Sequence, residues 1–86
     1  MAVGRGLALY HYVGCFFCAR VQSAAEGFGI ELELRNIHAH AEYADDLAAA
    51  MGRTTVPVLR IAEPGGEGRW LPESSDIIEY LEANAS

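Results

Sequence analysis

The 86-residue sequence contains no lysine, and its six basic residues are all arginine. Twelve acidic residues outnumber them, so the formal net charge is -6 at pH 7. The arginines are also scattered along the chain, whereas a protein that binds nucleic acid or an anionic membrane usually presents a basic stripe. We therefore expect neither nucleic acid nor a membrane among the partners of this protein.

The sequence also lacks a long apolar run and a secretory signal. No segment approaches the roughly 20 apolar residues of a membrane-spanning helix, and the N-terminus has no extended apolar core followed by a cleavage site. We therefore expect a cytoplasmic protein. A hydrophobic fraction of 51% disfavours disorder, and so short a chain has room for one core. We expect one free-standing domain over residues 1–86, present as a monomer.

Hydrophobic patterning predicts alternating strands and helices. Apolar or alternating segments indicate strands, and amphipathic segments that end at glycine indicate helices. The predicted strands cover residues 7–12, 30–37, 56–62 and 69–71, with a hairpin turn at residues 64–66. The predicted helices begin near Phe16, near His40 and after a cap at Ser74 or Ser75, and the first two end at the glycines Gly27, Gly29 and Gly52. The order is β-α-β-α-β-β-α, an α/β fold.

The only two cysteines, Cys15 and Cys18, lie where the first predicted strand turns into the first predicted helix. They are too close in sequence for a disulfide between them to link distant segments of the chain. A thiol at a helix N-terminus faces unpaired backbone N–H groups and the positive end of the helix dipole, which can lower a cysteine pKa to roughly 3.5–7.5. Cys18 follows one turn later on the same helical face. The spacing therefore favours Cys15 as an attacking thiol and Cys18 as a resolving thiol.

A structural role and a zinc-binding role are both less well supported for the cysteine pair. Two ordinary buried cysteines would also fit a packed corner, because free cysteine is among the most buried residue types. A zinc site would need further ligands, such as His11, His38 or His40, and the sequence has no second CxxC motif. Lone histidines are more often surface or core residues, so we expect no metal.

The residues around the motif leave two questions open. Phe16 and Phe17 fit a substrate groove and core packing equally well. Pro57 follows Val56 at the entry of a strand, where base rates favour a trans bond. A cis bond would instead turn the Val56 backbone toward the thiol site, where it could pair with an extended peptide.

Three segments together resemble a glutaredoxin. They are the CxxC motif at Cys15, the stretch from Gly52 to Pro57, and the stretch from Leu71 to Leu81. The last stretch is even more similar to the N-terminal domain of glutathione transferases, whose Glu-Ser-x-x-Ile signature receives the γ-glutamyl end of glutathione. The resemblance covers nearly the whole chain. It implies a thioredoxin-like fold, with a four-stranded mixed sheet flanked by three helices.

The resemblance also implies an activity, glutathione-dependent thiol–disulfide oxidoreduction on glutathionylated or disulfide-containing proteins. Cys15 would be the nucleophile and Cys18 the resolving thiol, and glutathione would be a co-substrate rather than a bound cofactor. Pro57 would be cis, and the Val56 backbone would pair with the cysteinyl part of glutathione. The residues that would bind glutathione are Tyr12, Phe17, Thr55, Val56 and Pro57, with Glu73, Ser74, Ser75 and Asp76 at the γ-glutamyl end.

Some positions depart from the usual glutaredoxin pattern. Phe16 and Phe17 replace the proline and tyrosine of the usual motif, and Tyr12 replaces a lysine that usually pairs with the glycine carboxylate of glutathione. Arg53 or Arg20 could supply a substitute cation, although both also fit solvated surface charges. Two alternatives therefore stay open: a glutathione-ligated iron–sulfur cluster held by two subunits, and a non-catalytic module that docks glutathione or a partner.

Overall fold

The computed structural model describes residues 6–62 and 68–84, and it contains the predicted helices and strands in the predicted order. The predicted turn at residues 64–66 lies outside the described residues. None of the described helices combines the length and the apolar character needed to cross a membrane. The strands are β1 (Leu7–His11), β2 (Glu33–Asn36), β3 (Val58–Ile61) and β4 (Arg69–Leu71), and the helices are α1 (Phe16–Gly27), α2 (Ala41–Met51) and α3 (Ser74–Ala83).

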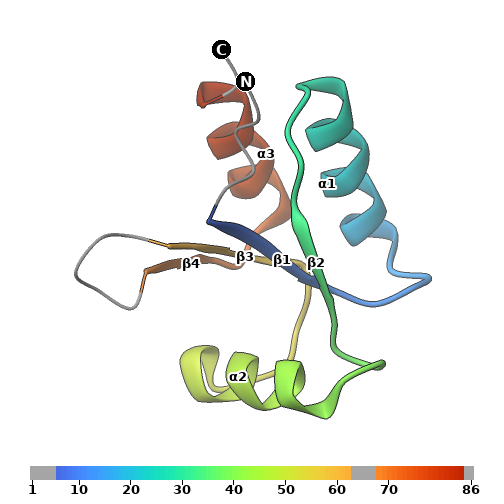
Figure 1. The fold of residues 1–86 in the computed structure, drawn as a ribbon, viewed down its shortest axis with the longest axis vertical. Helices are drawn as coiled ribbons and strands as arrows, with labels where there is room; N and C mark the ends of the chain where they lie inside the picture. The colour runs from blue at the N-terminus through green and yellow to red at the C-terminus, as the bar shows by residue number, and fades with distance from the viewer. Residues whose placement is uncertain (1–5, 63–67, 85–86) are drawn as a thin grey trace.

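The strands form one mixed sheet in the order β2-β1-β3-β4 (Figure 1). β1 runs parallel to β2 and antiparallel to β3, and β4 pairs antiparallel with β3. Leu9, in the middle of β1, lies opposite Leu34 of β2 on one side and Leu59 of β3 on the other. This four-stranded mixed sheet with its flanking helices confirms the predicted thioredoxin-like fold.

The helices cover both faces of the sheet. α1 and α3 pack side by side on one face, and α2 lies on the other (Figure 1). The larger core lies under α1 and α3 and includes Leu9, Val21 and Ile77, all fully buried. A second core on the side of α2 joins Tyr10 and Leu47. Neighbouring residues of β1 enter different cores because successive side chains of a strand point to opposite faces.

β2 is shorter than the strand predicted over residues 30–37. Ile30 donates its N–H to the carbonyl of Ala25 at 2.9 Å and so completes the end of α1 instead of pairing with β1. At the other end, Asn36 Oδ1 accepts the N–H groups of His38 at 2.8 Å and Ala39 at 3.2 Å, which forms a turn. Local hydrogen bonds therefore replace ladder hydrogen bonds at both ends of this edge strand.

The N-terminus of α3 also differs from the prediction. The expected cap at Ser74 or Ser75 is wrong, because both residues belong to the first turn of the helix and Glu73 occupies the N-cap position. Glu73 continues the extended backbone that leaves β4 (φ -103°, ψ 132°), so the helix starts directly after it. The Glu73 side chain makes no cap hydrogen bond. The side-chain cap that the serines would have provided is therefore absent from this helix.

Glycine substitutions test how the backbone is positioned before β4. Gly68 has a φ of +93°, and a Cβ there would collide with the carbonyl of Ile61, whereas Gly52 has a φ of +76° and open space. We expect Gly52→Ala to lower the free energy of unfolding by about 1 kcal/mol, the usual cost of a left-handed residue with a Cβ. Gly68→Ala should lower it clearly more, because the backbone must also move. Urea unfolding followed by Trp70 fluorescence measures both losses, and equal losses would contradict the predicted collision.

Candidate functional site

Cys15 is the N-cap residue of α1, as the sequence predicts. Its backbone is extended (φ -79°, ψ 116°), and its sulfur accepts the N–H of Cys18 at 3.2 Å. The Cys15 N–H donates to the carbonyl of Tyr12 at 3.3 Å, across a turn in which Gly14 has a φ of +96°. A β-carbon at Gly14 would be in a disfavoured conformation, so the glycine allows the turn that brings Cys15 to the helix start. The half-buried sulfur therefore takes the place of a capping oxygen.

Cys18 lies in a different environment from Cys15. Its side chain is only 1% exposed, and both cysteines are free thiols that form no disulfide. Burial raises the pKa of the Cys18 thiol well above its ordinary value, and the hydrogen bond with Cys15 raises it further. Cys18 is therefore a protonated thiol at neutral pH, and the accessible sulfur of the pair belongs to Cys15.

The Val56–Pro57 peptide bond is cis, as the glutaredoxin resemblance implies. A cavity of about 190 Å³ lies beside it and opens between the start of α1, the loop before β3 and the start of α3. Six of the predicted glutathione-binding residues line this cavity. They are Phe17, Thr55, Val56, Pro57, Glu73 and Ser74.

Three predicted residues do not line the cavity within the described parts of the chain. The Tyr12 ring stacks on His38, with centroids 4.6 Å apart, and it packs at the edge of the core under α2. Ser75 and Asp76 are exposed on the first turn of α3, next to Ser74. Ser75 and Asp76 therefore stay near the rim, whereas Tyr12 contributes its backbone carbonyl to the turn before Cys15.

Four further residues line the cavity that the site prediction does not include. They are Met51, Arg53, Val58 and Pro72. The sequence suggests Arg53 only as a substitute cation, and its position beside Thr55 and Val56 is the signal that could have placed it in the site. Arg20, the other candidate cation, is exposed on α1 and is not among the lining residues. Arg53 is therefore the cation that the fold brings to this cavity.

The aromatic pair after Cys15 faces solvent. Phe16 is 69% and Phe17 51% exposed, and their rings meet edge to face with centroids 5.3 Å apart. Val13, on the other side of Cys15, is 83% exposed. The open question about the phenylalanines is thus answered, because neither is a core residue. These three exposed apolar side chains flank Cys15 in the chain, and we call them the apolar rim.

The histidines occupy separate positions. His11 is buried in β1, His38 stacks on Tyr12, and His40 lies edge to face against Tyr43. Among residues 6–62 and 68–84, no three His, Cys, Asp or Glu side chains are grouped so that they could hold a metal ion. The described residues therefore offer no support for a zinc site.

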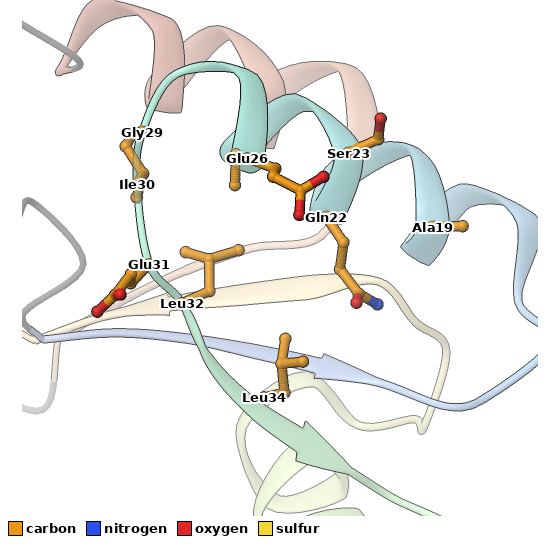
Figure 2. Close-up of a pocket in the computed structure, with 10 residues that line it drawn as sticks. Ala19, Gln22, Ser23, Glu26, Gly29, Ile30, Glu31, Leu32 and Leu34 are labelled. Carbon is orange, nitrogen blue, oxygen red and sulfur yellow. The ribbon is translucent and has the colours of Figure 1, made fainter.

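A larger hollow lies elsewhere, between α1 and the edge strand β2 (Figure 2). It has a volume of about 690 Å³, and its lining includes Gln22, Glu26, Leu32 and Leu34. None of its lining residues belongs to the CxxC motif or to the loop at Pro57. We therefore take the smaller cavity, which is lined by the cis peptide and by Phe17 of the CxxC motif, as the candidate functional site.

Comparison with known proteins supports the resemblance to glutathione transferases, and similar glutaredoxin structures support the thioredoxin-like fold. A structure of maleylacetoacetate isomerase from Anaeromyxobacter dehalogenans is 30% identical, with a TM-score of 0.67, and the match covers 92% of this chain and 35% of the isomerase. A trimeric glutathione transferase from Leishmania is 27% identical, with a TM-score of 0.76 over 95% of this chain and 17% of the transferase. Wheat glutaredoxin is 20% identical, with a TM-score of 0.68, and the match covers 94% of this chain and 82% of that one. No curated protein sequence matches the chain.

The share of the matched protein that the chain covers is small for the isomerase and the transferase and large for the glutaredoxin. The chain spans about a third of the length of the isomerase structures, 35% to 36%. The likeness to glutaredoxins bears on the fold, because the identity is low. The model of the glutathione S-transferase N-terminal domain family matches residues 9–86, nearly the whole sequence. The chain therefore belongs to the glutathione S-transferase N-terminal domain family.

Proposed function

We propose that this protein is a glutathione-dependent thiol–disulfide oxidoreductase of the glutaredoxin type. The observation that carries the proposal is the Cys15 sulfur at the N-terminus of α1, where it accepts a backbone N–H at 3.2 Å while the second thiol of the motif lies buried one turn away. Hydrogen bonds and helix dipoles stabilise the thiolate, and the thiolate is the nucleophile in disulfide exchange. The arrangement thus supplies one attacking and one protected sulfur.

The cavity beside Pro57 suits an extended tripeptide thiol. In the proposed complex, the cysteinyl part of glutathione lies along the Val56 backbone, whose N–H and C=O pair with it as in strand addition. The γ-glutamyl end lies at the start of α3, where Glu73 makes no cap hydrogen bond and leaves first-turn N–H groups for a carboxylate. The glycine carboxylate lies toward Arg53. A similar isomerase structure, 29% identical, contains glutathione in its active site, which supports this choice of ligand.

The proposed reaction begins when the Cys15 thiolate attacks the glutathione sulfur of a protein–glutathione mixed disulfide. A bond forms between Cys15 and glutathione, the bond to the substrate protein breaks, and the protein thiolate leaves and takes up a proton. A second glutathione thiolate then attacks the mixed disulfide, which gives oxidised glutathione and restores Cys15. In the dithiol branch, Cys18 attacks Cys15 instead, so that glutathione leaves and the motif becomes a disulfide.

A second candidate is transfer of glutathione to an electrophile, or glutathione-assisted isomerisation. The family match and the 27% to 30% identity to a transferase and an isomerase favour it. The exposed rim of Val13, Phe16 and Phe17 offers apolar surface beside the thiol for a nonpolar substrate. This chemistry would activate the thiol of glutathione itself, so it would not depend on Cys18.

Cysteine variants distinguish the two candidates. In an assay that couples turnover of a glutathione mixed disulfide to glutathione reductase, we expect Cys15→Ser to lower activity at least a hundredfold, because no other described cysteine is accessible. Cys18→Ser should keep this activity within a few fold and lose reduction of protein disulfides. Equal loss in both variants would contradict the monothiol step. Conjugation activity that survives in Cys15→Ser would favour the second candidate.

Alkylation tests whether the environment of α1 activates one sulfur and protects the other. At pH 7, we expect iodoacetamide to modify Cys15 at least tenfold faster than the cysteine of an unstructured peptide, because its sulfur accepts a backbone N–H at the start of α1. Cys18 should stay unmodified from pH 6 to pH 9, because a raised pKa keeps its thiol protonated until more alkaline pH. Mass spectrometry of digested protein measures both rates. A Cys15 rate equal to that of the peptide would favour the non-catalytic docking module.

A charge substitution tests the position of the glycine carboxylate. We expect Arg53→Ala to weaken glutathione binding about fivefold, which corresponds to about 1 kcal/mol for a solvent-screened ion pair. Arg20→Ala is the matched control, because Arg20 is also exposed but lies on α1 outside the cavity lining. Titration of each variant by calorimetry at low and high salt measures the change. Equal effects of the two substitutions would place the carboxylate elsewhere.

A further inference from the structure

The outer edge of the sheet at β2 is a surface that the proposed reaction does not use. β2 stands first in the order β2-β1-β3-β4, so one of its sides pairs with β1, and no strand of residues 6–62 and 68–84 pairs with the other. An edge strand presents backbone N–H and C=O groups to any chain that can pair with it. The residues of β2 do not line the cavity beside Pro57, so this edge is separate from the proposed chemistry.

The hydrogen bonds at the end of β2 show which of its residues face outward. Ile37 donates its N–H to the carbonyl of His11 at 2.9 Å, so the backbone of Ile37 faces β1. Alternate residues of a strand direct their N–H and C=O groups to the same side, so Glu33 and Arg35 also face β1. The N–H and C=O of Leu34 therefore point outward from the edge of the sheet.

The side chains at this edge are apolar on one face and charged on the other. Leu34 is 49% exposed, and together with Leu32 it lines the hollow of about 690 Å³ between β2 and α1 (Figure 2). Glu33 and Arg35 lie on the opposite face, because successive side chains of a strand alternate. They form an ion pair with each other at 2.8 Å. An exposed leucine on an open strand edge is a combination that favours pairing with another chain.

The charges of β2 are complementary to a second, antiparallel β2. When the pair is centred on Leu34, each Glu33 lies opposite Arg35 of the second copy. Leu34 then meets its equivalent in a hydrogen-bonded pair, which its outward N–H and C=O groups allow. Glu33 and Arg35 fall on the non-hydrogen-bonded positions, where facing Cα atoms are about 4.5 Å apart rather than about 5.5 Å. Opposite charges therefore occupy the positions at which cross-strand side chains lie closest.

Arg35 has hydrogen-bond donors left for this contact. Its Nε donates to Glu33 of the same chain at 2.8 Å, and its Nη1 donates to the Tyr10 hydroxyl at 2.7 Å. A guanidinium group carries five N–H donors, so Nη2 can donate to a carboxylate of a second chain. Glu33 is accessible for the reciprocal contact, because its side chain is 58% exposed.

We propose that a second copy of this chain binds along the outer edge of β2, in an antiparallel pair centred on Leu34. The two four-stranded sheets then join into one continuous sheet about a two-fold axis, and both copies contribute the same surface. Centring the pair on Glu33 or Arg35 would place like charges opposite each other and would need backbone groups that face β1. Centring it on Leu32 would place Glu31 opposite Glu33.

The paired segment is short, so the dimer is expected to dissociate reversibly. The carbonyl of Asn36 already accepts the N–H groups of Ala39 and His40, each at 3.2 Å, which limits pairing at that end of β2. Small interfaces of this kind belong to transient assemblies, and we expect a Kd of about 10–100 μM. The monomer expected from the sequence is then the form present at low concentration.

Sedimentation equilibrium of the full chain measures this association. The chain has a mass of 9.3 kDa, and we expect the average mass to rise from this value at low micromolar concentration to twice this value near about 1 mM. A mass that stays at one chain over this range would overturn the inference. A mass that rises beyond two chains would also contradict it, because a two-fold pair through β2 leaves no second β2 edge open.

Charge reversal tests the register. We expect Glu33→Arg to raise the Kd at least tenfold, because it places like charges opposite each other at two symmetric positions. Arg35→Glu should do the same, and an equimolar mixture of the two variants should dimerise again, because every pair then regains opposite charges. Glu82→Arg is the matched control, since it changes the net charge equally at an exposed position of α3. Equal weakening by Glu33→Arg and Glu82→Arg would place the interface elsewhere.

Amide hydrogen exchange tests the pairing on the unsubstituted chain and does not depend on the folding of any variant. Followed by nuclear magnetic resonance, the Leu34 amide should exchange slowly at concentrations where the dimer forms and at least tenfold faster on dilution. The Arg35 amide, which faces β1, should stay protected at both concentrations. Fast exchange of the Leu34 amide in a sample that sediments as a dimer would overturn the inference.

A peptide of residues 31–37 distinguishes a second copy from another extended chain. If the protein sediments as a monomer and the peptide protects the Leu34 amide, the edge accepts a strand but not a second copy, and the proposed dimer is wrong. The thiol assays on Cys15 and Cys18 use a different part of the molecule. Failure of the dimer would therefore leave the proposed function standing, and failure of the thiol chemistry would leave the dimer standing.

Discussion

The site depends on the hydrogen bond between the backbone N–H of Cys18 and the sulfur of Cys15. Every helix leaves N–H groups unpaired at its start, and an oxygen of a capping side chain usually accepts one of them. Here a sulfur accepts it, so the contact that begins α1 is also the one on which the proposed thiol chemistry relies.

Burial then gives the two cysteines different roles. The four residues from Cys15 to Cys18 span about one turn, which carries the chain from a half-buried cap into the core. The outer cysteine stays half-buried beside the exposed Phe16 and Phe17, whereas the inner cysteine is only 1% exposed. The proposed chemistry uses both environments in sequence, first attack from the outer thiol and then resolution from the inner one.

The remaining parts of the site come from segments that are distant in the sequence. The sheet order β2-β1-β3-β4 places the loop before β3 next to the end of β1, and the strand pair β3 and β4 delivers the chain to the start of α3. Arg53, Pro57 and Ser74 consequently share one cavity. The family match is consistent with this architecture.

The order of helices and strands, the position of Cys15 at a helix start and the left-handed end of α2 at Gly52 were all predictable from the amino-acid pattern, because each depends on contacts within a few residues. It also indicated most of the cavity lining through the family resemblance. Only the packing of distant elements explains why Phe16 and Phe17 face solvent, why the Tyr12 ring stacks on His38, and why Cys18 is buried. Burial and side-chain partners depend on which distant elements pack against a residue, and no local pattern specifies that.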